Sequence, residues 1–303
     1  MMKKNVLISG GSGFVGRHLT TLLLAKGFTV SILSRSEKQN KENIFYYKWD
    51  VAKQFIEEEA VLKADYIIHL AGENIGEKRW TAKRKAAIID SREQSTLLLY
   101  SVIKKSNKQL DAFISASAIG YYGAINGQEI CTETTPPEND FLGYACQKWE
   151  DSIDFIENLN IRTVKIRTGL VLGENDGFLK KLIPLFKYRL GAALGTGQQY
   201  MPWIHIDDLC EIYWQAIQKN EMSGPYNAAI NDNTTNEIFS KTLAQLFGYH
   251  IWLPNVPAFI LETALGEMSK IVLTGRRVSS DKIEQTGFKF KYTILKEALK
   301  DCI

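Results

Sequence analysis

Two residues four positions apart, Tyr144 and Lys148, could together carry out proton transfer. On a helix, side chains at this spacing share one face, so the phenol and the ammonium point into the same space. A phenol with a pKa near ~10 is a poor acid–base catalyst at neutral pH, and a neighbouring cation stabilises its phenolate. The same spacing also arises by chance on ordinary helix surfaces, so the pair needs support from the rest of the chain.

A serine at the end of an apolar strand supplies that support. Residues 115–117, Ser-Ala-Ser, follow a short apolar run and precede the helix that carries Tyr144. In a parallel sheet the end of a strand faces the ligand crevice, so a hydroxyl there can hydrogen-bond a substrate carbonyl or alcohol. Ser117 is our first choice for this role and Ser115 is the alternative. Tyr122, a few residues further on, is expected to line the pocket.

A glycine-rich turn near the N-terminus indicates where a dinucleotide would bind. It follows a β-branched strand beginning at Asn5 and precedes an apolar helical segment that Gly27 ends. A turn without Cβ atoms lets a pyrophosphate approach the backbone, and the helix behind it offers unpaired N–H groups and a positive dipole end. The predicted cofactor contacts of this turn are Gly10, Gly13, Phe14, Val15 and Gly16.

The residues after the second predicted strand bear on which nicotinamide cofactor binds. That strand, residues 28–33, is followed by Ser34 and Arg35. An arginine here suits the 2′-phosphate of NADP, whereas an acidic residue would accept hydrogen bonds from the ribose 2′-hydroxyl of NAD. Glu37 argues for NAD but falls late for that role. We therefore predict NADP, with NAD as the less favoured cofactor. The alternative interpretation of Arg35 is a solvent-exposed loop cation.

The alternation of strands and helices predicts the fold that would position these residues. Strands are expected at residues 5–9, 28–33, 45–49, 65–70, 112–115 and 162–167, and the two longest helices at 81–105 and 143–158. Such alternation is typical of a parallel, doubly wound sheet, the Rossmann arrangement of the α/β class, which binds ligands at the carboxyl ends of its strands.

After Gly169 the pattern loosens, and the second half is expected to form a smaller, mainly helical substrate lobe. We predict a dinucleotide-binding domain at residues 1–170, to which the chain returns at about 203–230. The substrate lobe would then comprise residues 171–202 and 231–303.

Composition excludes several classes of function. The chain has 303 residues and a formal net charge of +3, too small to argue for nucleic acid as a partner. Its four cysteines show no paired spacing, which argues against a zinc site or a disulfide framework and fits a reducing compartment. The chain shows no signal peptide and no apolar run long enough to span a membrane. We therefore expect a cytoplasmic protein that acts on a small molecule, with no metal.

Several weak motifs in the same order resemble the extended short-chain dehydrogenase/reductase family, which includes nucleotide-sugar epimerases. They comprise the glycine turn, residues 69–72, Ser117, Tyr144 with Lys148, residues 167–169 and residues 203–208. Residues 73–75, 115–123, 140–142 and 257–290 are similar to an epimerase-like subgroup with a short extra C-terminal domain, the YfcH/YfhF type. This similarity assigns residues 254–303 to the extra domain.

The resemblance implies a hydride transfer and gives roles to the residues above. Tyr144 would give or take the hydroxyl proton of the substrate. Lys148 would lower the pKa of that phenol and hold the nicotinamide ribose, and Ser117 would orient the substrate oxygen. The family often pairs long helices into homodimers, so the helices at 81–105 and 143–158 form the surface to test.

Further site residues follow from the same comparison and from the position of charged groups. Asp50, after the third strand, resembles an adenine-contacting position, although an Asp there is as often a helix cap. His205 would line the substrate cleft, and Arg276 would meet an anionic substrate unless it is surface charge near a turn. The remaining predicted cofactor contacts are Leu70, Ala71 and Gly72.

Three functions are compatible with these residues. The first is an NADP-dependent oxidoreductase that acts on a carbonyl or an alcohol. The second is a nucleotide-sugar epimerase with a tightly held cofactor, in which the hydride leaves the substrate and returns to its other face. The third is a non-catalytic NADP(H)-binding sensor or scaffold, against which Tyr144 and Lys148 argue.

Overall fold

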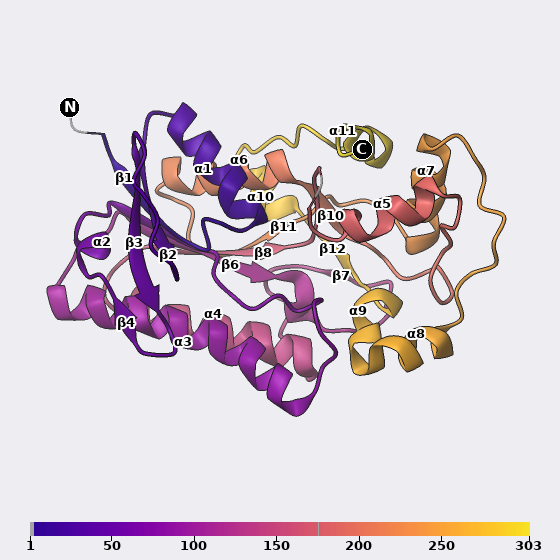
Figure 1. Cartoon of the computed structure of the whole chain (residues 1–303), viewed down its shortest axis with the longest axis horizontal. Helices are drawn as coiled ribbons and strands as arrows, with labels where there is room; N and C mark the ends of the chain where they lie inside the picture. Colours follow the sequence, from indigo (N-terminus) through magenta and orange to yellow (C-terminus); the bar gives the residue numbers. More distant parts are fainter. Residues whose placement is uncertain (1–2, 175) are drawn as a thin grey trace.

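A sheet of eight strands forms the centre of the computed structural model, which describes residues 3–174 and 176–303 (Figure 1). Side by side, the strands are β11 (Gly224–Ala228), β8 (Thr163–Thr168), β6 (Ala112–Ala118), β5 (Tyr66–His69), β1 (Asn5–Ser9), β2 (Thr29–Ser34), β3 (Ile44–Asp50) and β4 (Phe55–Ile56). All neighbours pair in parallel except β3 and β4. The predicted α/β, doubly wound fold is confirmed, and β11 is the strand of the parallel set that the sequence analysis did not single out.

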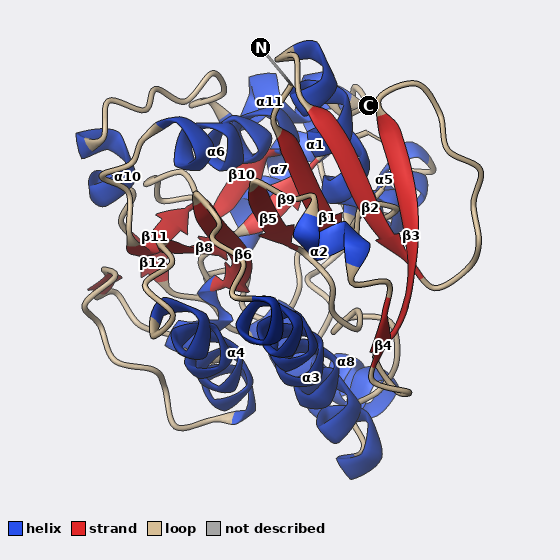
Figure 2. Cartoon of the chain, turned by 90° about the vertical axis from the view of Figure 1, so that its left-hand side faces the viewer, coloured by secondary structure: helices blue, strands red, loops and turns tan. Residues whose placement is uncertain are grey.

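Helices cover both faces of this sheet (Figure 2). They are α1 (Phe14–Ala25) and α6 (Ile206–Gln218) on one face, and α3 (Ala82–Ser106) and α4 (Phe141–Glu157) on the other, with the short α2 (Glu59–Leu62) beside α3. Side chains alternate along each strand, so Val6 and Ile8 pack with α1 and α6 while Leu7 packs with α3 and α4. Because this parallel sheet is buried on both faces, its strands consist of continuous runs of apolar residues.

The rest of the chain forms shorter elements beside the sheet. They are β7 (Ile130–Cys131), β9 (Leu170–Leu172), β10 (Trp203–His205), β12 (Arg277–Val278), α5 (Leu179–Lys187), α7 (Asn236–Leu246), α8 (Ala258–Leu265), α9 (Lys270–Leu273), α10 (Asp281–Gln285), α11 (Leu295–Asp301) and the 3₁₀ helices η1 (Ile119–Tyr122) and η2 (Gly266–Ser269). A separate apolar core holds α5, α7 and α11 together. The division into two domains at the predicted boundaries stays a prediction.

Contacts with β7 and with α6 help to fasten the C-terminal segment to the rest of the molecule. Strand β12 pairs with β7, which follows the end of β6 in the sequence. The carboxylate of Asp208, in α6, accepts the backbone N–H groups of Lys291 and Tyr292 at 2.7 and 3.0 Å. The tail is thereby held against both the sheet end and a helix of the sheet layer.

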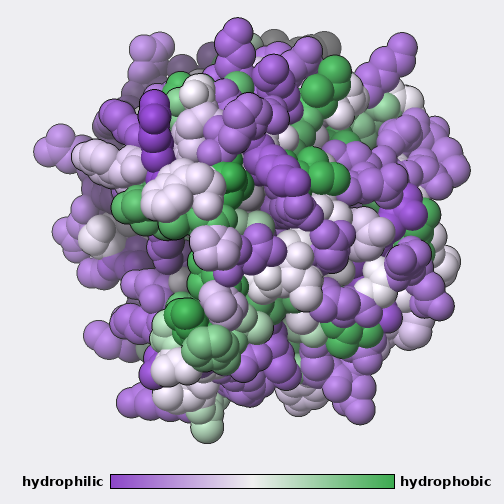
Figure 3. Space-filling model, turned by 90° about the vertical axis from the view of Figure 1, so that its right-hand side faces the viewer, coloured by the Kyte–Doolittle hydropathy of each residue, from purple (hydrophilic) through white to green (hydrophobic). Residues whose placement is uncertain are grey.

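Helix α8 has apolar side chains that the described residues leave uncovered. It contains no buried residue, and Phe259 is 67% exposed. In Figure 3 apolar side chains gather on the lower part of the face that includes α8. Within residues 3–174 and 176–303, no helix combines the length and the hydropathy needed to cross a bilayer.

Candidate nucleotide-binding and active site

The glycine turn after β1 is built for close backbone approach. Gly10 has a φ of +74°, and a Cβ atom there would lie 3.0 Å from the backbone nitrogen of Ala71. A Cβ on Gly16 would lie 2.4 Å from the carbonyl oxygen of Gly10. Glycine is therefore needed at both positions, because α1 and the residues after β5 pack directly on the turn.

The N-terminus of α1 fits an anionic group. Gly13 is its N-cap and supplies no side-chain cap, so the first N–H groups of the helix have no intrahelical partner. Ser12 and Gly13 lie at the surface rather than under other residues. Unpaired N–H groups at the positive end of a helix dipole are what a pyrophosphate requires. The residues present at this turn therefore fit a dinucleotide.

A buried histidine holds the neighbouring loop, residues 70–72, in place. His69 Nδ1 lies 2.6 Å from the hydroxyl of Ser9, and Nε2 lies 3.1 Å from the hydroxyl of Ser95. Ser95 donates to the Arg92 carbonyl, so it accepts from Nε2–H, and Ser9 donates to Nδ1. Burial, followed by the charge of Arg92, lowers the pKa of His69 to about 3. The neutral ring fixes Ser9, whose oxygen accepts the N–H groups of Leu70 and Ala71.

Arg35 lies directly after β2 and is exposed. In the described parts of the chain it has no ion-pair partner, so its guanidinium is available to a ligand. Glu37, which argued for NAD, pairs instead with Lys48 of β3 at 3.3 Å. The hydroxyl of Ser34 donates to the carbonyl of Ser36 at 2.8 Å and so shapes the turn. The arrangement is compatible with the predicted role of Arg35.

The predicted adenine contact Asp50 ends β3 and caps a turn. Its carboxylate accepts the backbone N–H of Lys53 at 3.2 Å. Local capping, the alternative interpretation of this residue, therefore accounts for Asp50 as the structure has it.

Helix α4 begins where its sequence provides a cap. Asp140 accepts the N–H of Gly143 at 2.8 Å and the N–H of Ala124 at 2.6 Å. A Cβ on Gly143 would lie 2.0 Å from the carbonyl oxygen of Glu138, so only glycine lets the chain cross itself here. These contacts fix the position of the helix against the segment after β6.

The face of α4 that meets the end of β6 carries Leu142 and Cys146. A Cβ on Gly120, in η1, would lie 3.6 Å from Leu142 Cβ and 3.5 Å from the Cys146 sulfur. Burial raises the pKa of the Cys146 thiol to about 12, so it stays protonated and is a poor nucleophile. Leu142 and Cys146, which lie four positions apart on this face, are thus unsuited to proton transfer at neutral pH.

The predicted pair Tyr144 and Lys148 lies on another side of α4. Tyr144 is 49% exposed, and the Lys148 ammonium lies 5.7 Å from the centre of its ring. Successive helix residues are ~100° apart, so residues 144 and 146 point in nearly opposite directions. Phe155, further along the same side of α4, is also 49% exposed. The predicted roles of Tyr144 in proton transfer and of Lys148 in holding the nicotinamide ribose are not supported, because both residues lie on a side of α4 turned away from the end of β6.

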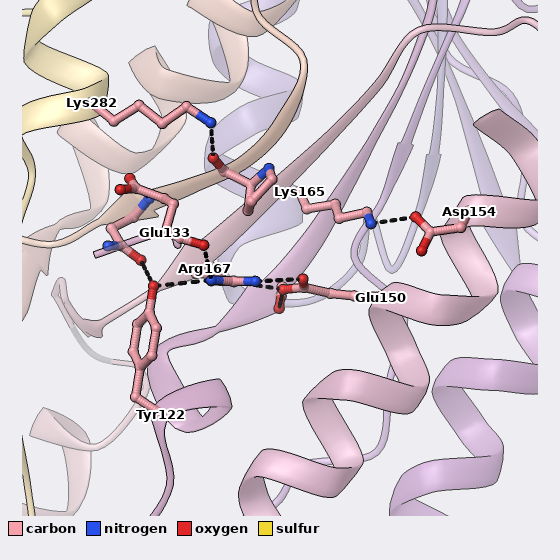
Figure 4. A network of polar contacts seen from close by, with 10 residues as sticks. Tyr122, Glu133, Glu150, Asp154, Lys165, Arg167 and Lys282 are labelled. Carbon is pink, nitrogen blue, oxygen red and sulfur yellow. Dashed lines mark hydrogen bonds and ion pairs between the residues drawn. The ribbon is translucent and has the colours of Figure 1, made fainter. Parts of the chain in front are cut away.

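Arg167 and Glu150 form a buried ion pair (Figure 4), and Ser117 bonds to this pair instead of facing a crevice. Its hydroxyl donates to the Glu150 carboxylate at 2.6 Å. Arg167, in β8, donates to the same carboxylate through Nε at 2.9 Å and Nη2 at 2.8 Å. Ser117 is 3% exposed. Its predicted role toward a substrate oxygen is therefore not supported, since the hydroxyl already donates its hydrogen to Glu150. Ser115, the alternative, is fully buried and donates to the Ala116 carbonyl.

Tyr122 belongs to this network and does not line a pocket. Its hydroxyl donates to Asn227 at 2.7 Å and accepts from Arg167 at 3.1 Å. Burial, opposed by the charge of Arg167, raises the pKa of the phenol. With 1% of its surface exposed, Tyr122 cannot contact a substrate, which corrects the prediction.

His205 is also structural. It is the N-cap of α6, is 1% exposed, and its Nε2 lies 3.3 Å from the Asp301 carboxylate. The ring stacks on Tyr292 with the two centres 3.8 Å apart. Burial lowers its pKa, although nearby carboxylates oppose the shift. The C-terminal segment covers His205, so the prediction that it lines the substrate cleft is wrong.

The predicted anion contact Arg276 faces a carboxylate of the chain itself. Its Nη1 lies 3.7 Å from Glu138 Oε2, and its role toward an anionic substrate stays a prediction.

Arg92 is a cation at the site that sequence reasoning missed. Its guanidinium carbon lies 3.1 Å from the place of a Cβ on Gly72 and 4.9 Å from the centre of the Trp149 ring. Burial lowers its pKa. No carboxylate of the described residues forms an ion pair with it. Its position in a long polar helix gives no sequence signal, because Arg residues there usually face solvent.

Comparison with known proteins identifies the family. The model of the NAD dependent epimerase/dehydratase family matches residues 6–229, and a domain of unknown function, DUF1731, matches residues 256–302. The chain belongs to the NAD dependent epimerase/dehydratase family. In this family member the first match extends from the second residue of β1 to just after β11, and the second contains α8 to α11 and β12.

Relatives of this epimerase family member match it along its whole length. It is 35% identical over 300 residues to the epimerase family protein YfhF of Bacillus subtilis, covering 99% of this chain and 98% of the relative. The human epimerase family protein SDR39U1, solved with NADPH, is 28% identical with a TM-score of 0.85 over 98% of both chains. A nucleoside-diphosphate sugar epimerase of Corynebacterium glutamicum is 31% identical with a TM-score of 0.80, over 99% of this chain and 58% of that one.

Proposed function

We propose that this epimerase family member is an NADP(H)-dependent oxidoreductase that moves hydride to or from a carbonyl or alcohol. The observation that carries the proposal is the N-terminus of α1, which has no side-chain cap, behind a glycine turn, with Arg35 after the next strand and without an ion-pair partner among the described residues. The human relative solved with NADPH supports the choice of cofactor. Bound NADP(H) would supply or accept the hydride.

The chain's own residues would hold the cofactor at four places. The N–H groups at the start of α1 would bind the pyrophosphate, and Arg35 would bind the 2′-phosphate. Leu70 and Ala71, fixed by Ser9, would contact the cofactor through their backbone. Arg92, whose guanidinium lies against Gly72, would place a positive charge beside this loop.

Proton transfer in this proposal does not use Tyr144. Since Leu142 and Cys146 face the end of β6, the proton that accompanies hydride transfer must come from another element or from water. This is where the chain departs from the mechanism that the sequence resemblance implies.

A second candidate function follows from the two residues that α4 turns toward the end of β6. A face of α4 with Leu142 and Cys146 in place of an acid–base pair suits a protein that binds NADP(H) and reports or scaffolds without turnover. An epimerase remains the third candidate, supported by the similarity to the nucleoside-diphosphate sugar epimerase of Corynebacterium glutamicum.

Identification of the bound nucleotide and a turnover assay test these candidates. The purified protein is denatured, and any released nucleotide is identified by mass spectrometry and absorbance. We expect an empty protein that takes up NADPH in preference to NADH and consumes it with a panel of aldehydes and ketones. Tightly held NAD would support the epimerase instead. Strong NADPH binding without consumption of NADPH would support the sensor, and no binding of either nucleotide would refute all three.

A further inference from the structure

Four large side chains protrude into solvent at the C-terminal end of α5 and in the segment between α7 and α8. They form the apolar tip, whose members and exposed fractions are Leu185 (48%), Leu190 (55%), Trp252 (68%) and Tyr188 (75%). In Figure 1, α5 and α7 lie at the end of the molecule opposite β1, β2 and β3. The apolar tip is thus a projecting surface at one end of the long axis.

Hydrogen bonds join the parts of the apolar tip into one surface. The backbone N–H of Leu190 donates to the carbonyl oxygen of Leu185 at 2.8 Å, which brings the chain back over the end of α5. The indole N–H of Trp252 donates to the carbonyl oxygen of Arg189 at 3.0 Å, so this ring lies beside residues 188 and 190. Single exposed apolar side chains are common on soluble proteins, but a group held together in this way marks an interaction surface.

The two segments that supply the apolar tip carry positive charge only. Residues 177–206 and 238–261 contain no Asp or Glu, and their basic residues are Lys180, Lys181, Lys187, Arg189 and Lys241. Lys187 and Arg189 flank Tyr188 and are exposed. Neither forms an ion pair with a carboxylate in the described parts of the chain. Exposed cations without counter-charges, placed between apolar side chains, suit an anionic partner.

A membrane surface fits this combination better than an acidic protein does. Trp and Tyr favour the headgroup level of a bilayer, because one end of each ring is apolar and the other can hydrogen-bond. Leu side chains between them add apolar area at the acyl boundary, and Lys and Arg attract anionic headgroups. A protein partner would need a matching hollow for rings that project this far, whereas lipid headgroups rearrange around them.

We propose that the apolar tip docks this protein on anionic membranes. Its four side chains enter the headgroup region, and Lys187 and Arg189 contact the phosphate and carboxylate groups of the lipids. The contact is peripheral, because only side chains reach the interface. Membrane docking is a binding function in addition to the proposed oxidoreductase activity, and neither depends on the other.

Co-sedimentation of the full chain with lipid vesicles tests the proposal. One set of vesicles contains phosphatidylcholine alone, and the other contains phosphatidylcholine mixed with phosphatidylserine. We expect the partition coefficient on the mixed vesicles to be at least about tenfold higher, and added salt to lower it. Binding to neither set overturns the proposal in favour of an acidic protein as the partner. Equal binding to both sets overturns it as well.

A double variant tests the role of the two cations. Lys187→Gln with Arg189→Gln should lower the partition coefficient on the mixed vesicles by about tenfold or more. The control, Lys53→Gln with Lys63→Gln, makes the same charge change on exposed residues beside β4 and α2, at the other end of the molecule (Figure 1). It should lower the coefficient much less. An equal loss in both double variants would show attraction by net charge alone and would exclude this docking surface.

The exposed aromatic side chains are tested by truncation. Tyr188→Ser should weaken binding to the mixed vesicles by about tenfold, because it removes a ring that enters the interface. Phe55→Ser, at an exposed aromatic residue of β4, should leave binding unchanged. Circular dichroism checks that both variants are folded. Full binding by Tyr188→Ser would show that the tip does not enter the bilayer.

Trp252 reports insertion directly. It is exposed, whereas Trp214 is half-buried and the other four tryptophans are buried. Vesicles that contain brominated lipids should quench the fluorescence of the wild-type protein. Trp252→Phe keeps an apolar ring, so it should still bind these vesicles, but most of the quenching should be lost. Quenching that persists in Trp252→Phe would place the membrane contact elsewhere on the molecule and refute the assignment.

Discussion

The guanidinium of Arg167 and the carboxylate of Glu150 form a two-point ion pair, with hydrogen bonds of 2.9 and 2.8 Å and both side chains buried. The pair joins β8 to α4, and through Tyr122 and Asn227 it reaches β11 (Figure 4). Together with the buried apolar residues of α4, it determines the rotation of this helix about its own axis, because Glu150 must face the sheet. Residue 148, two positions away, then faces outward.

Glu150→Ala should strongly destabilise the fold. Removing one partner leaves the Arg167 charge buried and uncompensated, so the free energy of unfolding should fall by about 3–5 kcal/mol. Urea unfolding followed by circular dichroism measures the loss. Lys105→Ala, which breaks an exposed ion pair with Glu58, is the control and should cost less than about 1 kcal/mol. A similar small cost for both variants would show that the buried pair is not needed.

Arg35→Ala should weaken NADPH binding far more than NADH binding. Loss of a charge-assisted hydrogen bond to the 2′-phosphate should raise the NADPH dissociation constant by about tenfold or more. Fluorescence titration with both nucleotides measures the effect. Lys38→Ala removes another exposed cation of the same loop and should change neither constant. An equal loss for both nucleotides would exclude a contact to the 2′-phosphate.

Gly13→Val should abolish nucleotide binding and leave the fold intact. The new side chain would occupy the exposed N-terminus of α1, where the pyrophosphate is expected, and its Cβ would lie 3.2 Å from the Gly10 carbonyl oxygen. Circular dichroism checks the fold, and NADPH titration checks binding. Gly76→Val is the matched control and should bind NADPH normally. Unchanged binding by Gly13→Val would show that the nucleotide lies elsewhere.

Tyr144→Phe and Lys148→Met should leave the NADPH dissociation constant within about twofold of the wild-type value, because neither side chain faces the end of β6. The double variant should behave in the same way, since the two residues contact each other on one outer stripe. Fluorescence titration of the three variants provides the measurement. A tenfold weakening by Lys148→Met would restore this residue to the cofactor site.

Pairing of α3 and α4 into a homodimer stays a prediction.

Stability should fall as the pH is lowered below the ordinary pKa of histidine. His69 has a folded-state pKa of about 3, well below its unfolded value, so the unfolded chain binds more protons between these two values. The stabilisation is complete above pH 6.5 and is lost as the pH falls toward 3. His69 should therefore cost about 2 kcal/mol between pH 7 and pH 5.

The pH effect is separated from other groups by substitution. Urea midpoints are measured at pH 7 and pH 5 for the wild-type protein and for His69→Gln. The variant should lose this part of the pH dependence, whereas His250→Gln, at an exposed position, should retain it. An identical pH dependence in His69→Gln and wild type would mean that His69 is not the group responsible.

Local patterns in the sequence were sufficient for the sheet and the nucleotide turn. A strand buried on both faces needs a run of apolar residues, and Asn5 to Ser9 has one. A close backbone crossing needs glycine, and Gly10 and Gly16 supply it. The apolar requirement applies to every side chain of the strand, and the glycine requirement applies to residues near one another in the chain. The residue types alone therefore reveal both requirements.

The composition of the active site was decided by tertiary packing. The spacing of Tyr144 and Lys148 fixes only that they share a side of α4. Which side faces the sheet depends on the burial of Trp149 and Ile153 and on the ion pair of Glu150 with Arg167, whose partners are 17 residues apart. Likewise, Arg189 and Trp252 meet only because segments far apart in the sequence fold together. Spacing gives the relative direction of neighbouring side chains, and only the packed core gives their absolute direction.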